Sequence, residues 1–93
     1  MKSPYTRDPY ERRLIHFLNF VNLTPDEFVT LGRKEPSVVE KKVMSFIATQ
    51  KARVEKGEIT GATISNFLKA IRLLLEMNDV YLNWKKIRRI LPR

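Results

Sequence analysis

Apolar side chains recur along almost the whole chain at the three- and four-residue spacing of an α-helix. Two long stretches show this most clearly, with apolar positions at Val39, Val43, Phe46, Ile47 and Val54 and at Ile64, Phe67, Leu68, Ile71, Leu74 and Leu75. Such spacing places apolar side chains on one helix face, where another helix can cover them. No stretch alternates apolar and polar residues for more than a few positions, so we expect no sheet. The pattern predicts an all-α fold, a compact bundle of four main helices plus a short C-terminal helix.

The first helix is expected to begin at Asp8. The segment Asp8-Pro9-Tyr10-Glu11 combines an N-cap residue, a proline at the first helical position and a capping-box acid. The apolar positions of this helix predict a buried stripe made of Tyr10, Leu14, Phe17, Leu18 and Val21. The polar residues of the helix fall largely on the opposite, solvated side, and they are Arg12, Arg13, His16 and Asn19.

A second, short helix is predicted after Thr24. Thr24 and Glu27 have the spacing of a capping box, and Gly32 can end the helix in a left-handed conformation. Pro36 or Ser37 then opens a longer third helix that ends near Gly57.

The fourth helix is expected to run from Thr60, its N-cap, to about Met77, with Asn78 as a C-terminal stop. Asn83 is predicted to cap a last helix from Trp84 to about Leu91, which Pro92 ends. Trp84 lies on the apolar edge of that helix, and we expect it to pack in the core.

Positive charge is concentrated in the second half of the chain. The 93 residues carry 18 Lys and Arg against 10 Asp and Glu, a net charge of +8. Residues 1–40 hold six basic and six acidic side chains, so residues 41–93 supply the whole excess. A charge imbalance confined to one half of a domain favours a polyanionic partner. With no cysteine, no apolar stretch long enough to span a bilayer and no secretory signal, we expect a soluble, cytoplasmic protein associated with the nucleoid.

Catalytic machinery is not evident in the sequence. The chain has one histidine, His16, and no cysteine, so neither a nucleophilic triad nor a zinc site can be assembled with any specificity. The three glycines do not form a phosphate-binding loop. We therefore expect a protein that is not an enzyme, with no cofactor, no metal and no small-molecule substrate.

Double-stranded DNA is the partner that the polar helix faces favour. Basic, amide and hydroxyl side chains on a helix can contact phosphates and base edges. The third helix carries such a face at Lys42, Ser45, Thr49 and Arg53, and the fourth carries another at Thr63, Asn66, Lys69 and Arg72. The last helix adds four cations, Lys85, Lys86, Arg88 and Arg89.

The segment from Thr60 to Arg72, TGATISNFLKAIR, resembles the last long helix of the core-binding, SAM-like domain of tyrosine recombinases, the phage-type integrases. That family has a Thr- or Ser-led start there, followed by Thr-Ile-x-x-Tyr/Phe-Leu-x-x-Ile/Leu-Arg/Lys. Residues 76–79 and 82–87 are similar to archaeal integrase-like proteins in particular, and residues 24–28 match the layout of the same domain. The resemblance covers nearly the whole chain and is most specific over residues 60–91.

The resemblance implies that residues 1–93 form one core-binding domain, which clamps duplex DNA for recombination by a separate catalytic domain. It implies DNA contacts from the fourth helix through Thr63, Asn66, Lys69 and Arg72, and from the third helix through Lys42, Ser45, Thr49 and Arg53. Other recombinase protomers would be further partners. The catalytic residues of the family belong to the other domain, and no His-x-x-Arg occurs here.

Two other functions stay open. The bundle could be a protein–protein interaction module, with Tyr81, Leu82 and Ile90 forming an apolar surface for a partner. It could also be a DNA-binding regulator that acts alone. Membrane binding through the last helix is disfavoured because that helix has too little apolar area.

Overall fold

Five helices make up the part of the chain that the structure describes. The computed structural model describes residues 4–90 and the side chains of residues 10–90. In chain order the helices are α1 (Pro4–Val21), α2 (Pro25–Lys34), α3 (Pro36–Glu55), α4 (Gly61–Met77) and α5 (Trp84–Arg88). No strand occurs between residues 4 and 90. The predicted all-α bundle of four main helices and a short last one is confirmed.

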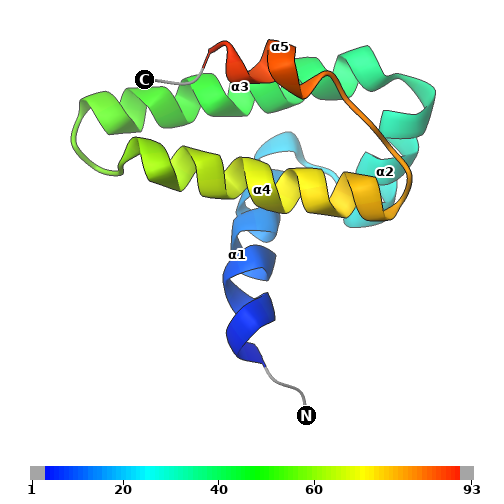
Figure 1. The fold of residues 1–93 in the computed structure, drawn as a ribbon, viewed down its shortest axis with the longest axis horizontal. Coiled ribbons are helices and arrows are strands. Elements are labelled where there is room, and N and C mark those ends of the chain that lie inside the picture. Colours follow the sequence, from blue (N-terminus) through cyan, green and yellow to red (C-terminus); the bar gives the residue numbers. More distant parts are fainter. Residues whose placement is uncertain (1–3, 91–93) are drawn as a thin grey trace.

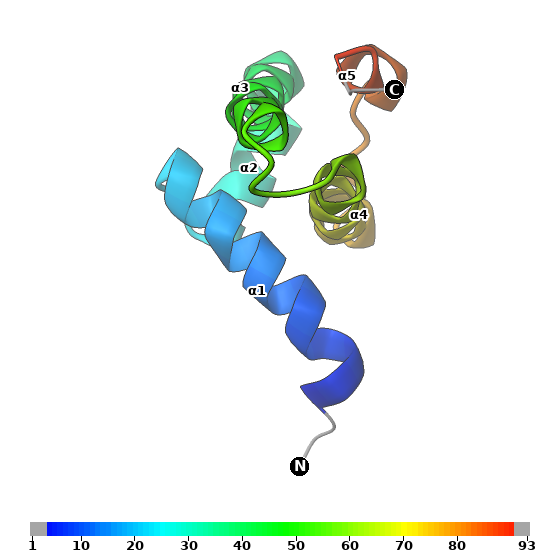
Figure 2. The ribbon, with the colours of Figure 1, turned by 90° about the vertical axis from the view of Figure 1, so that its left-hand side faces the viewer.

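The antiparallel pair α3 and α4 is the layer around which the other helices are arranged (Figure 1). Seen along this pair, α1 lies on one side of it and α5 lies on the opposite side (Figure 2). α1 packs across both α3 and α4, and α2 packs mainly on α3. The first turns of α1 project beyond the rest of the bundle in both views. The bundle therefore has two opposite faces, one carrying α1 and the other carrying α5.

The helix starts that the sequence predicted by capping are largely confirmed. Thr24 and Glu27 form a complete capping box, in which Glu27 N donates to Thr24 Oγ1 at 3.1 Å and Thr24 N donates to Glu27 Oε1 at 2.9 Å. Asn83 caps α5 by accepting a hydrogen bond from Lys86 N at 3.1 Å. Thr60 is the N-cap residue of α4, but its side chain makes no capping hydrogen bond. α5 ends at Arg88, before the predicted end at Leu91, which lies outside the described residues together with Pro92.

Three helices end in the same way, with one residue in the left-handed conformation. That residue is Asn22 after α1 (φ 60°), Gly57 after α3 (φ 79°) and Asp79 after α4 (φ 61°). The next amide then donates to the carbonyl five residues earlier, at 3.1, 2.9 and 2.8 Å respectively. This Schellman arrangement satisfies carbonyls that the last turn leaves unpaired. Glycine adopts the conformation without steric cost, and Asn and Asp are the side chains that best tolerate it.

The predicted start of the first helix is wrong. α1 begins at Pro4, four residues before Asp8, because a proline at the first helical position supplies the same start signal there. The predicted burial of Tyr10 is also wrong, since 41% of its surface is exposed. α1 crosses the α3–α4 pair instead of lying along it, so its apolar stripe is buried only near the crossing, at Phe17 and Leu18.

Gly32 does not end the second helix as predicted; it lies buried inside α2. A Cβ at this position would come within 2.9 Å of Val80 Cγ1 and 3.6 Å of Leu75 Cδ2. The glycine therefore serves close packing of α2 against the end of α4 and the connection that follows it. Gly32 was predicted as a helix stop, but its role is to let α2 approach Leu75 and Val80, which are far from it in the sequence.

Four phenylalanines connect α1, α2, α3 and α4 at the centre of the core. The ring centroid of Phe46 lies 5.1 Å from that of Phe17 and 5.0 Å from that of Phe67, both edge-to-face. Phe17 in turn contacts Phe28 at 5.1 Å. Edge-to-face geometry is favourable because the positive ring edge meets the negative ring face. Phe46 is thus the ring through which α1 and α4 are both held to α3.

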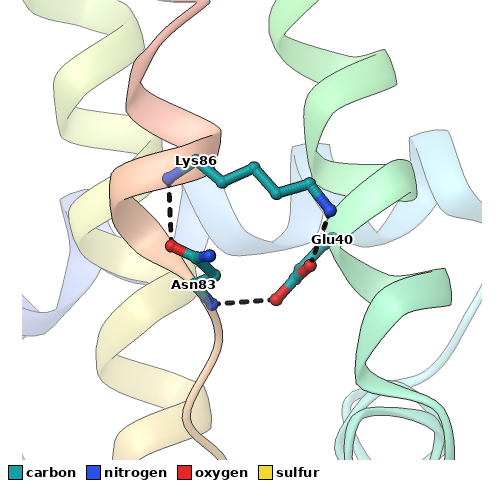
Figure 3. A network of polar contacts seen from close by, with 3 residues as sticks. All are labelled: Glu40, Asn83 and Lys86. Atoms are coloured by element: carbon teal, nitrogen blue, oxygen red, sulfur yellow. Dashed lines mark hydrogen bonds and ion pairs between the residues drawn. The ribbon is translucent and has the colours of Figure 1, made fainter.

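Glu40 attaches α5 to α3 through a small polar network (Figure 3). The buried carboxylate accepts hydrogen bonds from Asn83 N at 2.8 Å and from Lys86 Nζ at 3.2 Å. Because Asn83 also caps α5, one acid fixes both the start of that helix and its position on α3. Buried carboxylates are costly unless they are paired in this way.

Candidate nucleic-acid interface

A hollow between α4 and α5 brings three of the predicted DNA-binding residues together. Its cations are Lys69 and Arg72 of α4 and Arg88 of α5, and we refer to these three as the α4–α5 patch. The hollow has a volume of about 230 Å³ and is also lined by Leu68, Leu73, Glu76 and Trp84. The patch is formed by packing, because Arg88 reaches the α4 cations only when α5 docks against the bundle.

Trp84 forms part of the wall of this hollow. It is 7% exposed, which confirms that it packs in the core as the sequence predicted. The guanidinium carbon of Arg72 lies 5.7 Å from the centre of the indole ring, a cation–π distance. Arg72 Nε also donates to Glu76 Oε2 at 2.7 Å. Arg72 is therefore held in place on the surface, and Lys69 and Arg88 are the cations of the patch without an ion-pair partner among the described residues.

The four cations of the last helix do not act as one group. Lys85, Arg88 and Arg89 are exposed. Lys86 is half-buried and bound to Glu40, so it belongs to the network that docks α5. Three of the four predicted contacts on this helix are thus available to a polyanion, and the fourth has a structural role.

The predicted row on α3 lies away from α5. An α-helix turns by about 100° per residue. Counted around α3 from Glu40, which contacts α5, the four residues of this row lie at about 140° to 220°, on the opposite side of the helix. Arg53 is engaged within its own helix end, since it donates to Glu58 Oε1 at 3.2 Å and to Gln50 Oε1 at 3.0 Å. Thr49 Oγ1 donates to the Ser45 carbonyl at 3.2 Å. Lys42 is half-buried and has no ion-pair partner among the described residues.

Only part of the predicted row on α4 lies beside α5. Its successive members are three residues apart, so each is displaced around the helix from the one before. Thr63 is half-buried, with its hydroxyl 3.4 Å from that of Thr60, and Asn66 is half-buried. Lys69 and Arg72 lie at the α5 side. The structure therefore brings Lys69, Arg72 and Arg88 together and does not bring the α3 row to them.

A second hollow contains two arginines, Arg12 and Arg13, that the sequence predicted only to lie on a solvated helix face. It is lined by Arg12, Arg13, His16 and Phe67, with a volume of about 340 Å³. His16 is exposed, yet its ring lies 5.3 Å from that of Phe67 and 5.8 Å from that of Phe46. The i, i+4 spacing of Arg12 and His16 was visible in the sequence, but the position of Phe67 beside them was not.

Exposed apolar side chains do not gather where a protein partner was predicted to bind. Leu82 is buried in the core and Ile90 is half-buried, so of that trio only Tyr81 is exposed. An apolar hollow lies instead between α1 and α4, lined by Tyr10, Glu11, Leu14, Ala70, Leu73, Leu74 and Met77.

Between residues 10 and 90 no group of three His, Cys, Asp or Glu side chains is placed to hold a metal ion. None of the described helices is both long and apolar enough to cross a membrane.

Comparisons with protein-family models, with curated proteins and with solved structures find no match to this chain.

Proposed function

We propose that this chain binds duplex DNA through the α4–α5 patch, as the core-binding domain of a tyrosine recombinase whose catalytic domain is separate. The observation that carries the proposal is the convergence of Lys69, Arg72 and Arg88 on one hollow. Clustered cations bind duplex DNA because phosphate contacts release condensed counterions. The domain itself would bind and not cut.

Two further observations support DNA as the ligand. Lys85 of α5 and Arg89, the residue directly after α5, are exposed and add two cations close to Arg88 in the chain. The guanidinium of Arg72 is held by Glu76 and Trp84, so little side-chain freedom is lost when it contacts a phosphate. The sequence resemblance over residues 60–91 selects the recombinase domain from among helical DNA-binding proteins, with a DNA-binding regulator as the alternative.

The test is a salt series of fluorescence-anisotropy binding to a short DNA duplex. Wild-type protein should bind at low salt, with the logarithm of affinity falling linearly as the logarithm of salt rises. The double variant K69A/R88A removes two phosphate contacts, so its slope should be shallower by about 1.8, at about 0.9 per contact. The matched control K34A/K41A removes two exposed lysines outside the patch and should keep the wild-type slope.

Two results would overturn the proposal. Equal slopes for K69A/R88A and K34A/K41A would mean that DNA is held by overall charge or by another surface. Absence of wild-type binding at low salt would remove DNA as a partner and favour the protein–protein interaction module.

A further inference from the structure

The hollow lined by Arg12, Arg13, His16 and Phe67 lies on the opposite side of the bundle from the α4–α5 patch. Within α4, Phe67 and Lys69 are two residues apart and so point about 200° apart around the helix. Phe67 faces α1, whereas Lys69 faces α5. α1, which carries Arg12 and Arg13, and α5, which carries Arg88, flank the α3–α4 pair on opposite sides (Figure 2). A single straight duplex cannot lie on both.

The α1 hollow has the composition of a phosphate site. Arg12 and Arg13 have no ion-pair partner among the described residues, in contrast to Arg53 and Arg72. A guanidinium that is not already paired can bind a phosphate through two parallel hydrogen bonds. His16 adds a ring N–H donor, and its ring is held against Phe46 and Phe67 instead of turning freely.

Side chains of α3 extend the same face. Phe46 contacts α1 through His16 and Phe17. Lys42 and Thr49 lie four residues before and three residues after Phe46, so they are its neighbours on the helix surface. Two of the α3 residues that the sequence assigned to DNA binding, Lys42 and Thr49, therefore lie next to the side of α3 that contacts α1.

We propose that this α1 face is a second phosphodiester-binding surface, so that one copy of the domain holds two DNA segments, one on each face. The inference rests on the proposed function. The layer between the faces is one helix thick, about 10–12 Å, which exceeds the screening length of about 8 Å at physiological salt. Phosphates bound on one face therefore repel those on the other only weakly.

The experiment uses two duplexes of the same sequence, one attached to beads and one carrying fluorescein in solution. Wild-type protein should retain the fluorescent duplex on the beads at moderate salt. The variant R12A/R13A should lose that retention while its affinity for a single duplex in anisotropy stays within about twofold of wild type, because the α4–α5 patch is intact. K34A/K41A removes the same charge outside both surfaces and should retain the duplex as wild type does.

Each remaining outcome overturns the inference in a distinguishable way. Wild-type binding of one duplex without retention of the second leaves the proposed function standing and removes the second surface. If R12A/R13A still retains the fluorescent duplex, the α1 face is not the second binding surface. A dimer with one DNA-binding face per copy would give that result. Failure of wild type to bind any duplex refutes the proposed function, and the second surface fails with it.

Discussion

Replacement of Glu40 should release α5 from the bundle before the rest of the domain unfolds. Glu40 accepts hydrogen bonds from Asn83 N and from Lys86 Nζ, and it is the side chain of α3 that holds the start of α5. In Glu40→Ala the Asn83 amide loses its partner in a part-buried position. α5 is then fixed mainly by Trp84 and Ile87, its two buried side chains.

The expected loss can be estimated from the two contacts. A part-buried amide left without an acceptor costs about 1–3 kcal/mol. Lys86 is 44% exposed in its side chain, so it regains water and its ion pair adds only about 0.2–1 kcal/mol. We therefore expect Glu40→Ala to lower the unfolding free energy by about 2–3 kcal/mol. Glu40→Gln keeps an oxygen for Asn83 N but loses the charge and the acceptor for Lys86 Nζ, which is free to turn to water, so about 1 kcal/mol is expected.

Trp84 provides the assay, because it is the single tryptophan of the chain and the first residue of α5. Urea unfolding is followed by Trp84 fluorescence and, separately, by far-ultraviolet circular dichroism, which reports all helices. In wild type the two transitions should coincide. In Glu40→Ala the fluorescence midpoint should fall below the dichroism midpoint. Glu55→Ala, which removes an exposed acid of the same helix, is the control.

Either of two results would refute a local role for Glu40 in holding α5. Glu40→Ala with the stability of Glu55→Ala would show that the network contributes nothing measurable. Coincident transitions, shifted equally in both probes, would show that α5 docking is inseparable from global folding and that Glu40 does not act locally.

Two other substitutions test the core. Phe67→Ala should cost about 3–5 kcal/mol of unfolding free energy, measured by urea denaturation, because the ring is buried against Phe46; a wild-type midpoint would contradict the packing of α4. Gly32→Ala places a Cβ 2.9 Å from Val80 Cγ1. Overpacking there should lower the free energy of unfolding by about 1–3 kcal/mol, more than the gain of about 1 kcal/mol from the higher helix propensity of alanine. Val80→Ala should partly rescue it in a double-mutant cycle, and a higher melting temperature for Gly32→Ala alone would contradict the close approach.

Local signals account for what the sequence predicted correctly about the fold. The capping box at Thr24 and the cap at Asn83 involve atoms within one turn, so residue order alone specifies them. Tyr10 and Gly32 were predicted wrongly because their surroundings depend on how helices cross. Periodicity tells which side of a helix is apolar, but it does not tell where along its length a neighbour covers that side.

The same distinction applies to the candidate site. The polar rows on α3 and α4 were visible in the sequence as polar helix sides, yet the positions of α1 and α5 were needed to show that Lys69 and Arg72 meet Arg88 and that the α3 row does not. Glu40 and Gln50 have polar side chains on the buried side of α3, and their partners lie partly on other segments. His16 is exposed, as the sequence predicted, but nothing in the sequence shows that its ring lies beside Phe67.

The central position of Phe46 has a consequence for the order in which the domain folds. Its ring contacts Phe17 and Phe67, which lie about 20–30 residues away on either side, so neither contact forms until the intervening chain has closed. Individual helices form in about a microsecond or less, well before those closures. The rate-limiting step should therefore be the arrival of α1 and α4 at an α3 that is already helical. Substitutions at Phe46 should then slow folding, whereas those at the α5 network should mainly accelerate unfolding.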